Sequence, residues 1–271
     1  IATCSTQWEE SKMIHCKDLN KDFETKKEMF KELVENKKLL IAQKKAQTKH
    51  SDGVYYYKVN DKLIDKADIS QIDLNNTNAL NVKAIINTTN IMDSHDDVHI
   101  PGLWTKTLQE NRNLMHLQEH RMEFDKIISS GEDLEAYTRY YNWSDLGIEK
   151  EGQTQALEFS SNVKKSRNKF MFEQYANNYV TNHSVGMRYI KIFLAVNDED
   201  YKEEYATWNR YIGEVVNREL AEEKGYFYAV TEAKLIEGSA VPLGSNEITP
   251  TRMVTPKENT AVKLLQDILI K

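Results

Sequence analysis

Ser184 lies in a segment whose residue types suit a reactive hydroxyl. Gly186 follows it by two positions, and apolar residues then alternate along the chain. This pattern predicts a strand whose first residues have small side chains that leave space beside them. A glycine beside a strand serine leaves room for a bound carbonyl and offers a main-chain N–H to its oxygen. The same pattern also fits an ordinary strand serine beside a packing glycine. Ser184 therefore becomes a candidate nucleophile only if a base and an orienting group lie near it.

His120 is the candidate base. The segment 114–120 alternates so that Leu114, His116, Gln118 and His120 share one face of a predicted strand. Imidazole titrates near neutral pH, so a histidine at a strand end beside a turn can act as a general base. A buried, hydrogen-bonded histidine with a structural role is the alternative.

Glu237 interrupts an apolar segment that is predicted to be a strand. A carboxylate in such a setting is costly unless a charged or hydrogen-bonding group pairs with it. A histidine could be that partner, and Lys234 and Arg188 are the other candidates.

Residues 93–99 suggest a second kind of chemistry. Asp93, His95, Asp97 and His99 are metal-ligand types within seven positions. However, the following Pro-Gly pair disfavours the helix that would bring both histidines to one face, and the Asp-Ser pair is typical of a turn. A metal hydrolase built on these residues is an alternative, while our prediction for the chain is no metal and no cofactor.

The elements that position these residues divide the chain into three parts. Residues 8–49 lack Gly and Pro and carry an apolar stripe among Lys and Glu, which predicts one long amphipathic helix. From Gly53 onward the residue types favour β-strands. A polar linker and a last amphipathic helix follow Gly244. We therefore expect an N-terminal helical extension (1–52), a β-rich domain (53–246), and a linker with a C-terminal helix (247–271). The predicted strands are 54–59, 79–89, 114–120, 127–145, 156–163, 181–192 and 226–235, and the predicted helices are 104–111, 166–177 and 197–224.

Composition narrows the class of protein. The chain has 271 residues, of which 40% are hydrophobic, so it can bury one good core. Its net charge of −6 argues against a general nucleic-acid binder, whose binding face would be basic. No apolar run reaches the roughly 18 residues of a membrane span, so no membrane contact is expected. Both cysteines, Cys4 and Cys16, precede the predicted domain, which fits a reducing, intracellular setting.

Three segments, in this order, resemble the tailed-phage prohead maturation protease family, which is related in fold to the herpesvirus assemblin proteases. They are Asp93-Ser94-x-x-Asp97-Val98-x-x-Pro101-Gly102-x-Trp104 leading to Leu114 and His120, then Ser184-Val185-Gly186-Met187, then Leu235-x-Glu237-x-Ser239-x-Val241-Pro242 with Asn246. The resemblance covers residues 54–251 and excludes the N-terminal extension. Residues 121–125 depart from the family, which often has a short polar turn with proline there.

The resemblance implies an α+β fold, a herpesvirus-protease-like closed β-barrel surrounded by helices. It implies a serine endopeptidase with Ser184 as nucleophile and His120 as general base, which only the fold can bring together. We predict Glu237 as the third member. A second histidine is the alternative, either His116 or His183, of which His183 is disfavoured because adjacent strand residues point to opposite faces.

The oxyanion hole of such an enzyme is left open by the sequence. Main-chain N–H groups near Gly186 or in a loop could form it, with help from Arg188.

The resemblance also implies a setting and partners. Such proteases act inside the phage procapsid in the host cytoplasm, where they cleave scaffold, capsid-protein extensions and themselves. Scaffold and major capsid protein would be the substrates, the outer helices would serve self-association, and no direct contact with nucleic acid is expected. The chain begins with Ile1, which fits self-cleavage. The alternative is a non-catalytic virion or assembly protein that keeps the fold, in which Ser184 and His120 would lie too far apart for a hydrogen bond.

Overall fold

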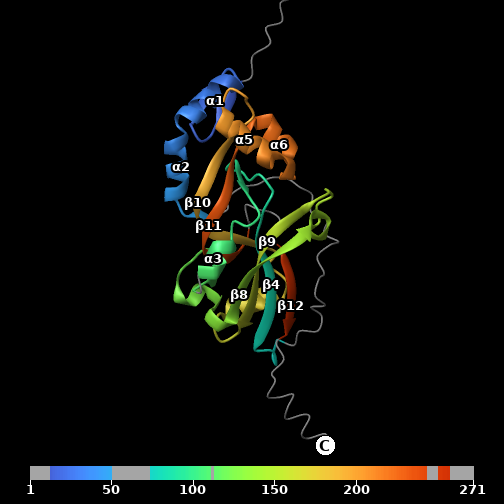
Figure 1. Ribbon diagram of the computed structural model, residues 1–271. Helices are drawn as coiled ribbons and strands as arrows, with labels where there is room; N and C mark the ends of the chain where they lie inside the picture. Colours follow the sequence, from blue (N-terminus) through green and yellow to red (C-terminus); the bar gives the residue numbers. More distant parts are fainter. Residues whose placement is uncertain (1–12, 51–73, 111–112, 243–249, 257–271) are drawn as a thin grey trace, which may run out of the picture.

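The computed structural model describes residues 13–50, 74–110, 113–242 and 250–256 (Figure 1). In this part the chain is a mixture of helices and open sheets. The strands are β1 (Ile14–Cys16), β2 (Lys21–Phe23), β3 (Lys49–His50), β4 (Ala79–Thr88), β5 (Asp97–His99), β6 (Met115–Gln118), β7 (Ile127–Ser130), β8 (Leu134–Asn142), β9 (Gln153–Lys164), β10 (Asn182–Val196), β11 (Tyr226–Val241) and β12 (Thr251–Pro256). The helices are α1 (Lys26–Glu35), α2 (Lys37–Ala46), α3 (Thr105–Glu110), α4 (Lys169–Ala176), α5 (Lys202–Tyr211) and α6 (Arg218–Lys224).

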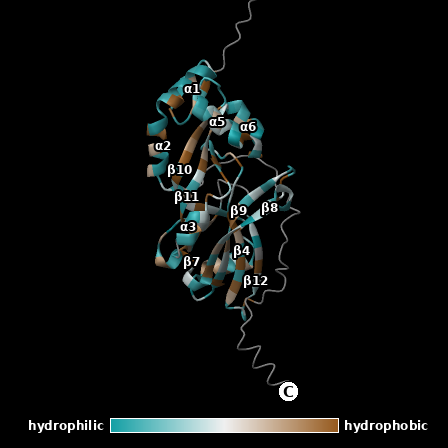
Figure 2. Cartoon of the chain, viewed as in Figure 1, coloured by the Kyte–Doolittle hydropathy of each residue, from teal (hydrophilic) through white to brown (hydrophobic). Residues whose placement is uncertain are grey.

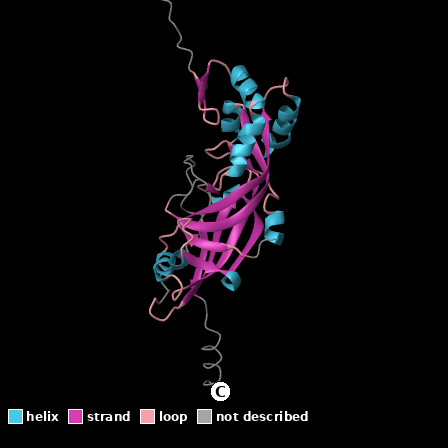
Figure 3. Cartoon of the chain, turned by 90° about the vertical axis from the view of Figure 1, so that its left-hand side faces the viewer, coloured by secondary structure: helices cyan, strands magenta, loops and turns pink. Residues whose placement is uncertain are grey.

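Two sheets form most of the molecule. The larger has the order β3-β10-β11-β6-β7, and β5 pairs with β11 on the same edge as β6 but nearer its start. The other has the order β12-β4-β9-β8, and β1 and β2 form a separate hairpin. Figure 3 shows the strands grouped together, with most of the helices gathered at one end. The long antiparallel pair β10 and β11 runs from that helical end into the strand-rich region (Figure 1).

The expected closed β-barrel is wrong. In the described residues β3 and β7 end the larger sheet, β12 and β8 end the other, and no pairing joins these ends. The two sheets instead pack face to face. A Cβ at Gly238 of β11 would lie 2.6 Å from the ring of Phe159 on β9 and 2.9 Å from Ile86 on β4, so glycine permits the close approach. Stacking buries the apolar faces that a barrel would have enclosed.

The expected long N-terminal helix is also wrong. Thr25 and Glu28 form a capping box, in which each side chain accepts a hydrogen bond from the other residue's main chain, so α1 begins at Lys26. Asn36 then separates α1 from α2, and the segment before Thr25 forms the β1–β2 hairpin. The absence of Gly and Pro could not reveal these breaks, although the Thr-x-x-Glu spacing was a readable start signal.

Residues 14–50, here called the N-terminal arm, pack on the same core as the larger sheet. Apolar side chains of the arm share one cluster with residues of β10 and β11. Those from the arm are Cys16, Phe23, Met29, Phe30, Leu33 and Leu40. Figure 2 shows polar residues dominating the outward surfaces of the helices. The arm therefore buries its apolar stripe against its own chain.

Other expected elements correspond closely to the structure or differ in a definable way. The strands predicted at 79–89, 114–120, 181–192 and 226–235 are β4, β6, β10 and β11, and the helix predicted at 166–177 is α4. The helix predicted at 197–224 is divided into α5 and α6, with a short 3₁₀ helix at Ile212–Glu214 between them. The polar linker after Gly244 contains β12, which pairs with β4. The strand predicted at 54–59 and the C-terminal helix lie outside the described residues.

A buried polar chain joins the two stacked sheets to α4. The Tyr175 hydroxyl lies 3.1 Å from His116 Nε2 and 2.9 Å from His183 Nε2. The other nitrogen of His116, Nδ1, lies 2.8 Å from Ser161 Oγ on β9. Burial first, and then the neighbouring His183, hold the pKa of His116 well below its usual 6.5. The core therefore contains an imidazole that stays neutral in the folded state.

Acid should weaken the fold through His116. The unfolded chain binds a proton at this residue near pH 6.5 whereas the folded chain does not, so stability is complete above that pH and is lost as the pH falls below it. Because burial raises the pKa of Asp93 to about 7, the folded chain binds a proton there as the pH falls, which increases stability over the same range. The contribution of His116 must therefore be isolated by comparing the wild type with a His116 variant.

Between pH 6.5 and pH 5 we expect the unfolding free energy of His116→Gln to fall by about 1.6 kcal/mol less than that of the wild type. Each fully titrating pH unit is worth about 1.4 kcal/mol, and the unfolded-state histidine is already half protonated at pH 6.5. Urea denaturation at several pH values measures both slopes. Equal slopes would show that His116 does not titrate differently in the folded and unfolded chains.

Candidate active site

His120 and Glu237 form a hydrogen-bonded pair at the centre of the candidate site. His120 Nδ1 lies 2.6 Å from Glu237 Oε1, and Glu237 is only 1% exposed. The second carboxylate oxygen, Oε2, accepts a hydrogen bond of 2.6 Å from Ser239 Oγ. Ser239 Oγ in turn accepts the main-chain N–H of His120 at 3.1 Å. Both oxygens of the buried acid are therefore held, and one of them orients the imidazole.

The backbone at His120 is strained. Glu119 and His120 both have positive φ, 54° and 58°, a conformation that costs a non-glycine residue about 1–3 kcal/mol. The turn is held by main-chain hydrogen bonds from Glu119 to Ala240 and from Arg121 to Gln118. These contacts bring His120, the second residue after β6, back over β11, so that its ring reaches Glu237.

Gly186 makes room for the acid. It lies opposite Glu237 in the β10–β11 ladder, and a Cβ at this position would overlap Glu237 Oε1 and come within 2.9 Å of Cδ. A larger residue at 186 would push the carboxylate away from His120. The absence of a side chain at Gly186 thus leaves the space that the Glu237 carboxylate occupies, in addition to any role beside a bound carbonyl.

Ser184 lies on the same face of the ladder. It is directly opposite Ser239, as Gly186 is opposite Glu237, and opposed residues of an antiparallel pair project to one side. Two-residue spacing on each strand therefore places Ser184, Gly186, Glu237 and Ser239 together. The fold gathers the predicted nucleophile, base and acid around one short stretch of β10 and β11.

The hydrogen bond between nucleophile and base is absent in this conformation. Ser184 is 1% exposed, and its hydroxyl has no hydrogen-bond partner in the described structure. A buried hydroxyl without a partner costs about 1–3 kcal/mol. The site therefore holds a complete acid and imidazole pair beside a serine that is neither bonded nor accessible.

The other predicted site residues lie elsewhere. His116 and His183 share the Tyr175 hydroxyl in the core between the sheets, so neither histidine forms the Glu237 pair. Arg188 is exposed on β10, opposite Lys234, and takes no part in the hydrogen bonds of the Glu237 pair.

The four predicted metal ligands form a turn and a separate polar network. Asp93 Oδ1 accepts the main-chain N–H groups of His95 and Asp97, which is turn chemistry. Asp97 pairs with Lys44, and His99 Nδ1 lies 3.0 Å from Asn87 Nδ2. Within the described ranges, no three His, Cys, Asp or Glu side chains are placed to hold a metal ion.

Ser239 is the functional residue that our sequence reasoning used only as part of a motif. Its spacing of two from Glu237 was a signal that both side chains share a strand face. Its roles, donating to the acid and accepting from the His120 main chain, could not be read from the sequence because His120 reaches it from a distant strand.

The arrangement is able to support base-assisted nucleophilic chemistry. A carboxylate only accepts hydrogen bonds, so Glu237 places the proton of the neutral imidazole on Nδ1 and leaves Nε2 as the basic nitrogen. A hydroxyl brought to that nitrogen would be activated as in other serine hydrolase sites.

Comparison of the chain with protein-family models, curated proteins and solved structures finds no match. Among the described helices, none combines the length and the apolar character needed to cross a bilayer.

Replacing Gly186 should break the acid and imidazole pair. In Gly186→Ala the added methyl group occupies the position of the Glu237 carboxylate, so we expect the His120 Nδ1–H signal in the imidazole ¹H–¹⁵N spectrum to lose its low-field, hydrogen-bonded shift. Gly213→Ala is the control, since no heavy atom lies within 4 Å of a Cβ there. An unchanged His120 signal in Gly186→Ala would contradict the proposed packing.

The unbonded hydroxyl of Ser184 should be a cost to stability. Removing a buried polar group that has no partner relieves its desolvation penalty, so Ser184→Ala should raise the free energy of unfolding by about 1 kcal/mol. Ser161→Ala, which removes a hydroxyl bonded to His116, should lower it by about 1–3 kcal/mol. Chemical denaturation compares the two, and a destabilised Ser184→Ala would show that the hydroxyl has a partner.

Proposed function

We propose that this chain is a serine endopeptidase with Ser184 as nucleophile, His120 as general base and Glu237 as the orienting acid. The observation that carries the proposal is the 2.6 Å hydrogen bond from His120 to the buried Glu237 on the ladder face that also bears Ser184. A buried acid that holds an imidazole beside a serine is the arrangement expected of an acyl-transfer site.

In the proposed reaction, Ser184 Oγ attacks the carbonyl carbon of the scissile peptide as its proton passes to His120 Nε2. The C–N bond then breaks, and His120 gives that proton to the leaving amine. A water molecule attacks the resulting ester with His120 again as base, which frees the acid product and Ser184. Glu237 remains a carboxylate throughout and stabilises the imidazolium that forms in each half of the cycle.

The biological setting we propose is maturation of a phage procapsid. Its support is that two of the three motifs of the prohead protease resemblance are paired in register, with Ser184 opposite Ser239 and Gly186 opposite Glu237. The substrates would be scaffold, the extensions of the major capsid protein and the chain itself, cleaved inside the procapsid in the host cytoplasm. Self-association, without contact to nucleic acid or membrane, belongs to the same proposal.

One observation favours the alternative, a non-catalytic virion or assembly protein. Ser184 Oγ is buried and has no hydrogen bond to His120 or to any other described group. On this alternative the His120–Glu237 pair would only stabilise the turn after β6. The two functions differ in whether Ser184 reacts.

Ser184→Ala should remove cleavage of a scaffold or capsid-precursor polypeptide while leaving a folded protein, since triad serines contribute about ten-thousand-fold or more to the rate. His120→Gln should do the same. Gel electrophoresis of the precursor and covalent labelling by a fluorophosphonate, which reacts with activated serines, give the two readouts.

Ser129→Ala is the matched control, because Ser129 is likewise buried with an unbonded hydroxyl but lies on β7. It should keep cleavage and labelling. Cleavage or labelling that persists unchanged in Ser184→Ala would remove Ser184 from its role and favour the assembly protein.

A further inference from the structure

Strand β3 occupies the edge of β10 next to Ser184. Lys49 pairs with Met187 and His50 with Gly186, antiparallel to β10. Gly186 is two residues from Ser184 on the same strand. The last strand of the N-terminal arm therefore lies against β10 beside the proposed nucleophile.

This edge is where an extended substrate would be expected to bind. A peptide commonly adds to an exposed strand edge, where main-chain hydrogen bonds hold it about 4.8 Å from the neighbouring strand. That position lies within reach of a serine side chain on β10. Strand β3 already pairs with this edge of β10 at Gly186 and Met187, and Ser184 is 1% exposed. A peptide carbonyl therefore cannot reach Ser184 Oγ in this conformation.

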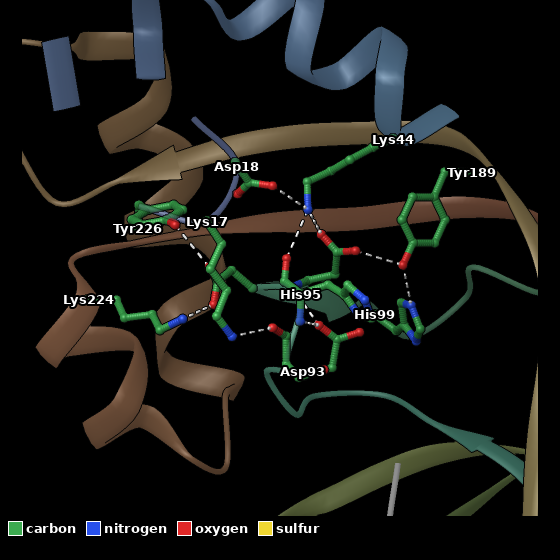
Figure 4. A network of polar contacts seen from close by, with 12 residues as sticks. Lys17, Asp18, Lys44, Asp93, His95, His99, Tyr189, Lys224 and Tyr226 are labelled. Carbon is green, nitrogen blue, oxygen red and sulfur yellow. Dashed lines mark hydrogen bonds and ion pairs between the residues drawn. The ribbon is translucent and has the colours of Figure 1, made fainter. Parts of the chain in front are cut away.

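A buried lysine holds the end of α2, immediately before β3. Lys44 Nζ donates hydrogen bonds to Asp97 Oδ1 at 2.8 Å and to the main-chain carbonyl of His95 at 2.9 Å, and it pairs with Asp18 Oδ1 at 3.3 Å. It also lies 4.2 Å from the centre of the Tyr228 ring. Figure 4 shows the side chain descending from α2 into this group.

The acceptor Asp97 is itself fixed to the core. The Tyr189 hydroxyl on β10 donates to Asp97 Oδ2 at 2.9 Å, and His99 Nε2 lies 3.2 Å from the same hydroxyl (Figure 4). Lys44 is therefore tied through one carboxylate to the strand that carries Ser184. Only four residues separate Lys44 from Lys49, so this anchor sets where β3 meets β10.

Other ion pairs of the arm lie nearer the surface and farther from β3. Lys27 pairs with Asp200, and Lys37 pairs with Glu203 and Glu204 on α5. They hold α1 and the start of α2, so the end of the arm can be released without freeing the whole arm.

We propose that residues 44–50 act as an autoinhibitory latch, in which Lys44 holds β3 on the edge of β10 where substrate would otherwise bind. The inference rests on the proposed function, since it requires Ser184 to be a nucleophile. Release of the Lys44 contacts frees β3, exposes the edge beside Ser184 and lets an extended peptide replace it.

Two kinds of substitution release the latch by different routes. Lys44→Met removes the ammonium. The double variant Lys49→Pro with His50→Pro removes the pairing alone, because adjacent main-chain N–H groups point to opposite edges and one of the two must face β10. Lys38→Met, at an exposed position of the same helix, is the matched control.

The rate of fluorophosphonate labelling at Ser184 is the readout, with Ser184→Ala to show that the label is specific. Circular dichroism confirms that each variant is folded, and hydrogen exchange at Gly186 and Met187 reports release of β3. We expect both latch variants to be labelled at least tenfold faster than the wild type, and Lys38→Met to match the wild type.

The failures are distinguishable. If exchange shows β3 released but labelling is no faster than in a reactive wild type, the latch is overturned and the proposed nucleophile stands. If neither the wild type nor any folded variant is labelled, the proposed nucleophile fails and the latch fails with it. Should Lys44→Met not fold, the proline variant decides, because it leaves the buried ion pairs in place.

Discussion

The register of β10 against β11 is the constraint on which the candidate site depends. It sets Gly186 opposite Glu237 and Ser184 opposite Ser239, so four residues from two distant segments share one face. Because glycine has no side chain, the Glu237 carboxylate can lie over position 186 and reach His120. A slip of one residue would turn these side chains to the other face, since side-chain direction in a strand has a period of two.

The opposite face of the same ladder explains why that slip is disfavoured. Gly238, between Glu237 and Ser239, packs against Phe159 and Ile86 of the second sheet, and His116 bonds to Ser161 across the same interface. A shifted register would place a carboxylate in this packed region without a partner, at a cost of several kcal/mol. The packing of the two sheets and the geometry of the site therefore have one cause.

The structure uses buried polar groups in two opposite ways. The buried Lys44 ammonium is paired with Asp97 and Asp18, and breaking such a buried pair typically costs about 3–5 kcal/mol, so the end of the arm is firmly held. At Ser184 a buried hydroxyl is left without a partner, and at His120 the backbone is held in a strained conformation. Local costs of this kind concentrate at functional sites, where surrounding packing sustains them. The acid and the imidazole of the site are thus hydrogen-bonded to each other, while its serine is buried and unbonded.

The sequence by itself determined the strands that carry the site, because alternation in 181–192 and 226–235 and the position of His120 after a short strand are local signals. It also determined that Glu237 needed a partner, while leaving His120, Lys234 and Arg188 as choices. Only the tertiary structure decided in favour of His120, through a turn with two left-handed residues that no local pattern announced. The open, stacked sheets, the strand β12 within a polar linker and the missing Ser184 hydrogen bond were likewise decided by long-range pairing and packing, which depend on contacts between residues far apart in the chain.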